Sequence, residues 1–168
     1  MNIVVLDPQQ WLAFSDSAHS VCFNETGYSE LERCDYALLV VKDDIPLMYA
    51  TIKQHDAITA YMSRGGAFPS VKGTTSSYKA FELILEFLFK NNSTVTMRVE
   101  NKNTPMLKFA MKAGFIIDGI TYHNMKIYLE HILEVKNVVD ATSGNSDNGN
   151  EQSGTTSGST KEKQLSAS

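Results

Sequence analysis

The chain has 168 residues, of which 42% are apolar, and a net charge of −4 at pH 7. Its length suits about one domain, and its acidic balance argues against nucleic acid or an anionic membrane as a partner. No apolar run reaches about eighteen residues, so we expect no membrane span. No basic residue precedes the apolar part of the start, MNIVVLDPQQ, so we expect no secretory signal. Two cysteines are too few for a disulfide scaffold and favour a reducing compartment, hence a cytoplasmic location.

The first 70 residues contain apolar runs of two kinds. Most are rich in β-branched residues or alternate with polar ones, which predicts strands, and one has helical spacing. The expected elements are a strand at 2–6, a helix at 9–22, a hairpin of strands at 36–41 and 47–53, and a strand at 57–62. Arg64-Gly65-Gly66 is expected to interrupt the last run, because glycine beside a strand marks a bulge or a close backbone approach.

The second half predicts a long helix, a strand, a short helix and two further strands. The apolar stripe that begins at Tyr78 recurs at helical spacing until Asn91-Asn92, and a strand follows at 94–99. In the short helix, Thr104 is expected to cap the first turn, Pro105 to take the first helical position and Gly114 to end it. Strands at 116–121 and 124–129 are expected to pair antiparallel around a turn near His123.

Composition changes sharply after residue 140. Residues 141–168 consist mainly of Ser, Gly, Thr and Asn, which cannot bury enough apolar surface to offset the entropy of ordering. We therefore expect one domain at 1–140 and a flexible, disordered tail at 141–168, which an assembly partner could order.

The stretch Glu100 to Phe115, ENKNTPMLKFAMKAGF, resembles the last conserved block of the GNAT (Gcn5-related N-acetyltransferase) superfamily. In that family an Asn leaves a strand, a short helix follows, and a Gly-Phe pair ends it. Asn103, Gly114 and Phe115 stand at the family spacing, and the resemblance extends over about 36–128. It implies an α/β (α+β) fold with a mixed, mostly antiparallel central sheet flanked by helices. It also implies acyl-CoA-dependent N-acyltransferase activity with acetyl-CoA as co-substrate.

The segment before the long helix is where the cofactor pyrophosphate is expected. A helix N-terminus after a glycine-containing loop binds anions through its free backbone N–H groups and its dipole. The family has a basic residue and then spaced glycines there; Lys72 and Gly73 match the start, whereas Thr75 and Ser77 replace glycines. The residues predicted to hold the cofactor are Lys72, Gly73, Thr74, Thr75, Ser76, Ser77 and Asn103. Alternatively, residues 74–77 only cap the helix.

Asn103 matches the family residue that hydrogen-bonds near the pantetheine arm of the cofactor, and the alternative is that it only helps to start a helix. The edge backbone of the strand at 94–99 is implied to face the same arm.

Catalytic residues are not evident. Acyl transfer to an amine needs a base for the ammonium and an acid for the leaving thiolate. The family acid is often a Tyr four residues before the helix-ending Gly, and that position is Ala110 here. Tyr61, Tyr122 and His123 could be recruited, although each could equally be a packing or surface residue. The four histidines have no metal-ligand spacing, so we expect no metal.

Two hypotheses follow. The first is an N-acyltransferase that acts on an amine of a small molecule or protein. The second is a catalytically degenerate GNAT-like structural or binding protein, which the Ala at 110 and the glycine-poor loop favour. The chain also loosely resembles the small acetyltransferase-like proteins of tailed bacteriophages, some of which are virion-associated, so the alternative location is the virion.

Overall fold

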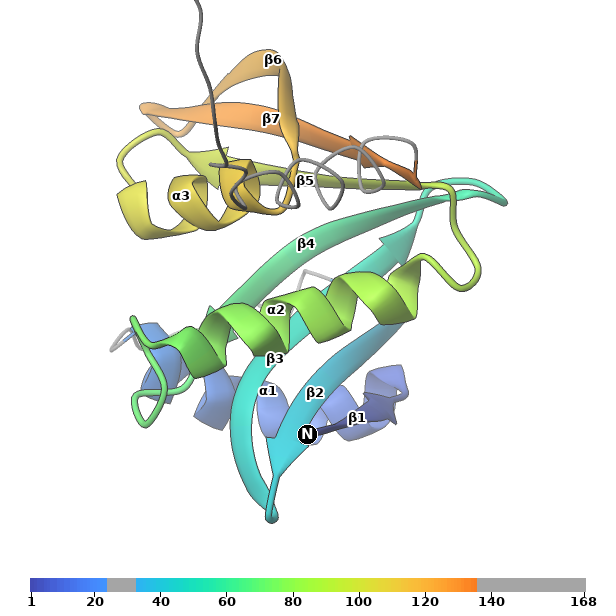
Figure 1. Ribbon diagram of the computed structural model, residues 1–168, viewed down its shortest axis with the longest axis vertical. Coiled ribbons are helices and arrows are strands. Elements are labelled where there is room, and N and C mark those ends of the chain that lie inside the picture. The colour runs from blue at the N-terminus through green and yellow to red at the C-terminus, as the bar shows by residue number, and fades with distance from the viewer. Residues whose placement is uncertain (24–32, 136–168) are drawn as a thin grey trace, which may run out of the picture.

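The computed structural model describes residues 1–23 and 33–135, which form one central sheet with three helices (Figure 1). The strands are β1 (Asn2–Leu6), β2 (Tyr36–Lys42), β3 (Ile45–Gln54), β4 (Thr59–Ala67), β5 (Thr94–Glu100), β6 (Ile116–His123) and β7 (Lys126–Glu134). The helices are α1 (Pro8–Phe23), α2 (Thr75–Leu88) and α3 (Thr104–Lys112). The predicted order and types of these elements are confirmed, whereas the predicted tail at 141–168 lies outside the described residues.

The seven strands lie in the order β1-β2-β3-β4-β5-β7-β6, and β4 with β5 is the one parallel pair among the described strands. The predicted mixed, mostly antiparallel sheet is therefore confirmed. Helix α2 makes the crossover that a parallel pair requires.

β4 and β5 part after a short shared stretch. They pair only from Thr59↔Thr94 to Met62↔Met97, although β4 continues to Ala67 and β5 to Glu100. Figure 1 shows the two ribbons diverging, with α3 on the β5 side of the opening and α2 on the β4 side. On the side that faces β4, the backbone of residues 98–100 has no strand partner. The parting thus leaves hydrogen-bonding groups free in the middle of the sheet.

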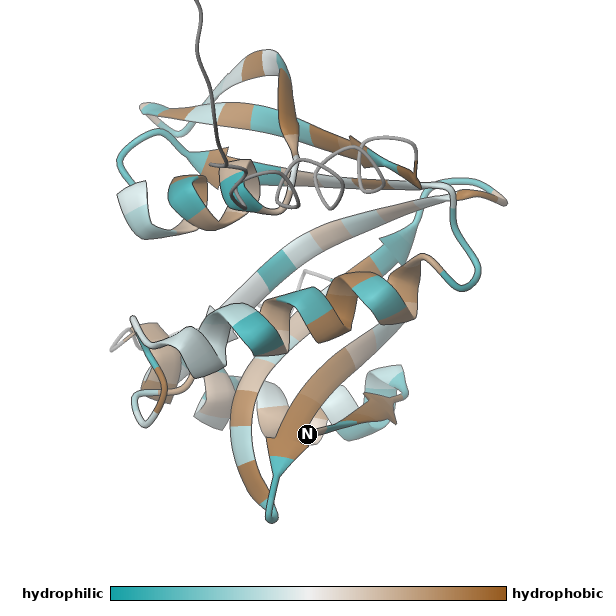
Figure 2. Ribbon diagram, viewed as in Figure 1, coloured by the Kyte–Doolittle hydropathy of each residue, from teal (hydrophilic) through white to brown (hydrophobic). Residues whose placement is uncertain are grey.

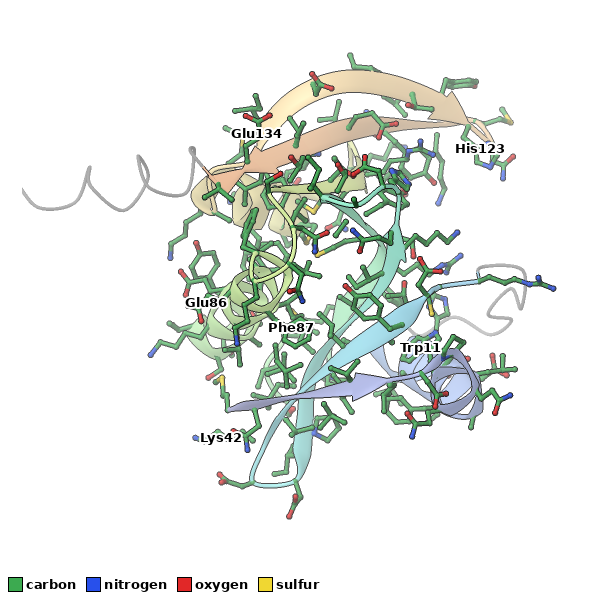
Figure 3. All side chains as sticks on the ribbon, turned by 90° about the vertical axis from the view of Figure 1, so that its right-hand side faces the viewer. Trp11, Lys42, Glu86, Phe87, His123 and Glu134 are labelled. Atoms are coloured by element: carbon green, nitrogen blue, oxygen red, sulfur yellow. The ribbon has the colours of Figure 1, made fainter. Side chains whose placement is uncertain are left out.

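The two faces of the sheet are covered differently. α2 and α3 pack on one face through a large apolar cluster that includes Ala60, Met62, Val95, Ile84 and Ala110. Figure 2 shows hydrophobic residues along β2 and on the inner side of α2, with hydrophilic residues outside. α1 covers part of the opposite face with a smaller cluster around Trp11, Ala37, Tyr49 and Phe68. Figure 3 shows Trp11 between its helix and the sheet.

β4 continues through the glycines after Met62, so the predicted interruption was wrong, whereas the irregularity and close backbone approach predicted there are confirmed. β4 runs through Arg64, Gly65 and Gly66 to Ala67, and its register with β3 shifts between Thr51 and Ile52. A Cβ on Gly66 would lie 3.0 Å from the Phe23 ring, and one on Gly65 3.1 Å from the carbonyl oxygen of Tyr49. The glycines therefore permit close approach of α1 and β3 to the strand.

The start of α3 was predicted one residue too late. Asn103, not Thr104, is the N-cap: its Oδ1 accepts a hydrogen bond from the backbone N–H of Met106 at 3.3 Å. Pro105 therefore takes the second helical position, where its missing N–H also costs no intrahelical bond. The predicted exit is confirmed, since Gly114 follows the helix with a φ of 92°.

A carboxylate caps α1. Asp7 Oδ1 accepts from the backbone N–H groups of Gln9 at 2.9 Å and Gln10 at 2.8 Å, and the Gln10 side chain accepts from the Asp7 N–H at 3.0 Å. This reciprocal arrangement is a capping box, with Pro8 at the first helical position.

Candidate functional site

The loop before α2 has the form expected of an anion site. Gly73 has a φ of 76°, a conformation that suits glycine, and a Cβ there would meet nothing within 4 Å. Thr74 is the N-cap with extended backbone, and its side chain makes no capping hydrogen bond. Instead its hydroxyl donates to the carbonyl oxygen of Val71 at 2.7 Å.

The first backbone N–H groups of α2 remain available. Among the described residues, no hydrogen-bond partner exists for the N–H groups of Thr75 and Ser76, whereas that of Ser77 donates to the Thr74 carbonyl at 3.2 Å. The Ser77 hydroxyl is buried and donates to the same carbonyl at 2.7 Å. Ser77, where the family usually has glycine, therefore turns inward and leaves the loop mouth open. Of the predicted cofactor residues, Gly73, Thr75 and Ser76 lie at this open start of α2 and are not buried.

Lys72 is engaged elsewhere. Its Nζ donates to the backbone carbonyl of Cys22 at 3.2 Å, at the C-terminal end of α1, where a cation suits the helix dipole. Burial raises the pKa of the Cys22 thiol to about 11, and the nearby Lys72 charge only partly opposes this shift. Cys22 is therefore a protonated core thiol and not a nucleophile.

α2 and α3 touch in front of the strand parting. The ring centroids of Tyr78 and Phe109 lie 5.4 Å apart in an edge-to-face arrangement, and Phe81 lies 6.2 Å from Phe109. Lys112 Nζ lies 3.9 Å from the centroid of the Tyr78 ring. Burial raises the pKa of Tyr78, so its hydroxyl stays protonated near neutrality. A pantetheine arm that ran from the start of α2 to the free edge of β5 would have to pass these side chains.

Ala110 and Asn103 occupy structural positions. Ala110 is fully buried in the apolar cluster, and its carbonyl accepts from the N–H of Phe115 at 3.0 Å. A large side chain would not fit there without repacking. The carbonyl oxygen of the Asn103 side chain is used as the cap of α3.

A polar cavity of about 510 Å³ lies on the opposite face, beside α1. Its lining comes from five strands: Lys53, His55, Tyr61, Ser63, Thr96, Arg98, Asp118, Glu130, His131 and Ile132. The register explains the assembly, because Lys53 is the cross-strand partner of Tyr61, and Tyr61 is that of Thr96. Tyr61 and Thr96 immediately precede the last paired residues of β4 and β5. The cavity therefore lies behind the parting of the two strands.

Some charged groups of the cavity have ion-pair partners and others have none among the described residues. Arg98 Nε contacts Glu130 Oε1 at 2.8 Å, and the Thr121 hydroxyl donates to the same carboxylate. Lys53 and Asp118 have no ion pair within residues 1–23 and 33–135. Asp118 occupies the irregularity of β6 between Ile117 and Gly119.

The other polar groups of the cavity include two buried atoms with unused hydrogen-bonding capacity. The rings of His55 and Tyr61 are stacked, with centroids 5.0 Å apart. Thr96 Oγ1 and His131 Nε2 are buried without a partner in the described part of the chain. A polar ligand in the cavity would offer Thr96 the hydrogen bond that the protein does not supply.

The tyrosine candidates fall in different places. Tyr61 lines the cavity, whereas Tyr122 is 70% exposed near the end of β6 and is not among the lining residues. His123 ends the same strand, at the tip of the β6–β7 hairpin (Figure 3). The structure thus brings one predicted candidate to a cavity. The cavity partners of Tyr61 were not predicted, because residues scattered over five strands form no linear motif.

A second cavity of about 370 Å³ lies near the C-terminal end of α2 and is lined mainly by neutral side chains such as Gln54, Phe87 and Asn92. It offers no charged group for chemistry. Within the described ranges, no group of three or more His, Cys, Asp or Glu could hold a metal ion. None of the described helices is long and apolar enough to cross a membrane.

Comparison with known proteins shows the fold. No family model and no curated protein sequence matches the chain. Mutant forms of a spermidine/spermine N-acetyltransferase from Vibrio cholerae match with a TM-score of 0.64 at 11% identity, over 83% of this chain and 97% of that one. The ribosomal-protein-S18-alanine N-acetyltransferase from Escherichia coli matches with a TM-score of 0.64 at 11% identity, over 80% and 93%.

A third match is the NatC complex bound to Gag peptide and CoA, with a TM-score of 0.55 at 17% identity over 80% of this chain and 99% of that one. A putative acetyltransferase of the GNAT family from Desulfovibrio desulfuricans matches with a TM-score of 0.51 at 15% identity, over 60% and 69%. The chain therefore has the GNAT fold, as predicted. The resemblance to bacteriophage proteins has no support in these neighbours.

Proposed function

We propose that the protein is an acyl-CoA-dependent N-acyltransferase. The observation that carries the proposal is the strand parting between β4 and β5, with an open helix N-terminus on one face and a polar cavity on the other. A thioester that reached the parting from the α2 side would meet an amine held in the cavity. When bound, acyl-CoA supplies the activated acyl group.

The residues of this chain have separate tasks in the proposal. The N–H groups of Thr75 and Ser76, with their hydroxyls, bind the pyrophosphate, and the free edge of β5 binds the pantetheine. Gly73 gives the loop its turn, since few L side chains adopt its φ of 76°, although a Cβ there would meet nothing within 4 Å. The hydroxyl of Tyr61 is the proton-transfer group, because Tyr61 is the one of the three predicted candidates that lies beside the parting, and Ala110 has no ionisable side chain.

Two observations favour the second function, a GNAT-like binding or structural module. The contact of Tyr78 and Phe81 with Phe109 closes α2 against α3, where the pantetheine would enter. Lys72 is also held at α1 and supplies no charge to the phosphate loop. In a module, the residues that fill this space stabilise the fold and need not move.

Calorimetric titration of acetyl-CoA into the full chain separates the two functions. The enzyme hypothesis predicts micromolar binding that Gly73→Glu abolishes, because a carboxylate would occupy the phosphate site. Gly73→Ala is the matched control: it carries the same positive-φ strain, of about 1 kcal/mol, without the charge. We expect Gly73→Ala to weaken binding less than tenfold.

Absence of binding at millimolar acetyl-CoA would contradict the enzyme hypothesis and favour the binding or structural module. Equal losses in both variants would assign the effect to loop strain and not to a phosphate site. Thermal unfolding of each variant checks that the domain remains folded.

A further inference from the structure

We propose that the cavity lined by Lys53, Tyr61 and Thr96 binds the acceptor amine, and that this acceptor carries a carboxylate close to its amino group. The inference rests on the proposed acyl transfer and names its substrate class: amino acids or compounds built like them, rather than polyamines.

The first reason is the positive charge of the cavity that has no counter-ion among the described residues. Arg98 is offset by Glu130, its partner at 2.8 Å, so that pair presents little net charge to a ligand. Lys53 is half-buried and has no such partner in the described part of the chain. A partly desolvated ammonium without a counter-ion is a binding site for an anion.

The second reason is position. Lys53 is the cross-strand partner of Tyr61, so their Cβ atoms lie about 5 Å apart, and Tyr61 is directly opposite Thr96 across the parting strands. A carboxylate on Lys53 would place an amino group a few bonds away beside Tyr61 and Thr96. Thr96 Oγ1, buried and without a partner among the described residues, can accept a hydrogen bond from that amino group.

The third reason is the location of the cavity's free negative charge. Asp118 lies on β6, and the sheet order places β5 and β7 between β6 and β4. At about 4.8 Å per strand, Asp118 is about 14 Å from the β4 side of the cavity. Asp118 therefore lies farther from the parting than Lys53, which is on β3, the neighbour of β4. Lys53, in contrast, favours the neutral amine that attacks, because a nearby positive charge lowers the pKa of an ammonium group.

The size of the cavity agrees with this class. About 510 Å³ accommodates a small molecule or one chain end, within the usual range of ligand pockets. The stacked rings of His55 and Tyr61 form a flat wall against which an aliphatic or aromatic side chain can pack.

The test uses matched amines that differ by one carboxylate: L-alanine and ethylamine, L-phenylalanine and 2-phenylethylamine, and L-lysine and cadaverine. Binding to the full chain is measured by ligand-observed NMR and calorimetry. We expect the carboxylated member of at least one pair to bind about 10- to 100-fold more tightly, the range for a hydrogen bond between charged groups. Lys53→Met should remove this preference without weakening the binding of the decarboxylated amine, and Lys53→Arg should retain part of it.

Lys42→Met is the control, because it removes the same charge at the tip of the β2–β3 hairpin, away from the cavity (Figure 3). The inference is overturned if no probe binds, if the decarboxylated amines bind as well as their partners, or if Lys53→Met changes nothing. Release of CoA from acetyl-CoA is recorded in parallel. A preference for carboxylated amines without CoA release would contradict the proposed acyl transfer but support the carboxylate-binding site. CoA release with a preference for decarboxylated amines would support the acyl transfer and contradict the carboxylate site.

Discussion

The three helices begin in two different ways. α1 and α3 satisfy their first N–H groups with their own side chains, Asp7 and Asn103. α2 begins at a Thr whose hydroxyl turns back to Val71, and its first two N–H groups have no partner within the described residues. Thr is a residue type that caps helices well, so composition does not cause the difference. The positive φ of Gly73 and the bond to Val71 orient the loop so that the start of α2 stays open.

This contrast shows where the fold gives up stability. A capped N-terminus contributes about 1 kcal/mol, and an open one forgoes that contribution unless a ligand supplies it. Three substitutions test the comparison, one at each helix.

The largest expected effect is at α1. Asp7→Ala removes two side-chain hydrogen bonds and the acceptor that faces the helix dipole, so we expect the free energy of unfolding to fall by about 2 kcal/mol. Asp7→Asn should lose less than half of that, because Asn also caps. Asp16→Ala, on the exposed side of the same helix, controls for the change in charge. Urea denaturation gives the values, and a loss below about 0.5 kcal/mol in Asp7→Ala would contradict the cap.

An intermediate effect is expected at α3. Asn103→Ala should lower the free energy of unfolding by about 1 kcal/mol, since it removes one hydrogen bond of 3.3 Å. Asn103→Asp should restore that stability but still lack the amide N–H₂ donor. If Asn103 also contacts the pantetheine, both variants weaken acetyl-CoA binding in calorimetry. Undiminished binding in Asn103→Asp would confine Asn103 to its capping role.

The smallest change in stability is expected at α2, with the opposite sign. Thr74 already has the extended backbone of an N-cap, so Thr74→Asp should cap the helix and raise the free energy of unfolding by about 0.5–1 kcal/mol. The same carboxylate would occupy the free N–H groups and repel phosphate, so acetyl-CoA affinity should fall at least tenfold. Thr74→Ser is the control and should change neither quantity. A stabilised variant that keeps its affinity would place the phosphates elsewhere.

Several local features of the fold were predictable from the sequence. The exit of α3 at Gly114, the hairpin turns and the strand at 94–99 depend on φ preferences and on side-chain alternation over a few residues. The cap of α3 was misplaced by one residue, because Asn103 and Thr104 are both good capping residues and only the observed hydrogen bond distinguishes them. A close approach at the glycines of β4 was predicted, but not that the strand continues through them, because their neighbours, Phe23 and Tyr49, come from distant parts of the chain.

The cavity shows the same limit more strongly. Lys53 and Thr96 are ordinary polar residues of alternating strands, and nothing in their spacing relates them. They meet across Tyr61 because β4 and β5 pair in parallel over four residues and then part. Lys72, in contrast, was identified from its place in the phosphate-loop pattern, but the packing of α1 against β4 gave its ammonium group another partner.

By itself, the sequence determined the order and kind of the helices and strands, the positions of the turns and the GNAT type of fold. These follow from local backbone preferences and from the period at which apolar side chains recur. Only the tertiary structure decided which helix start remains open, which helices close over the parting, and which charges meet in the cavity. Those outcomes depend on strand register and on contacts between segments far apart in the chain. A one-residue shift in the register of a strand would move its cavity side chains to the other face of the sheet.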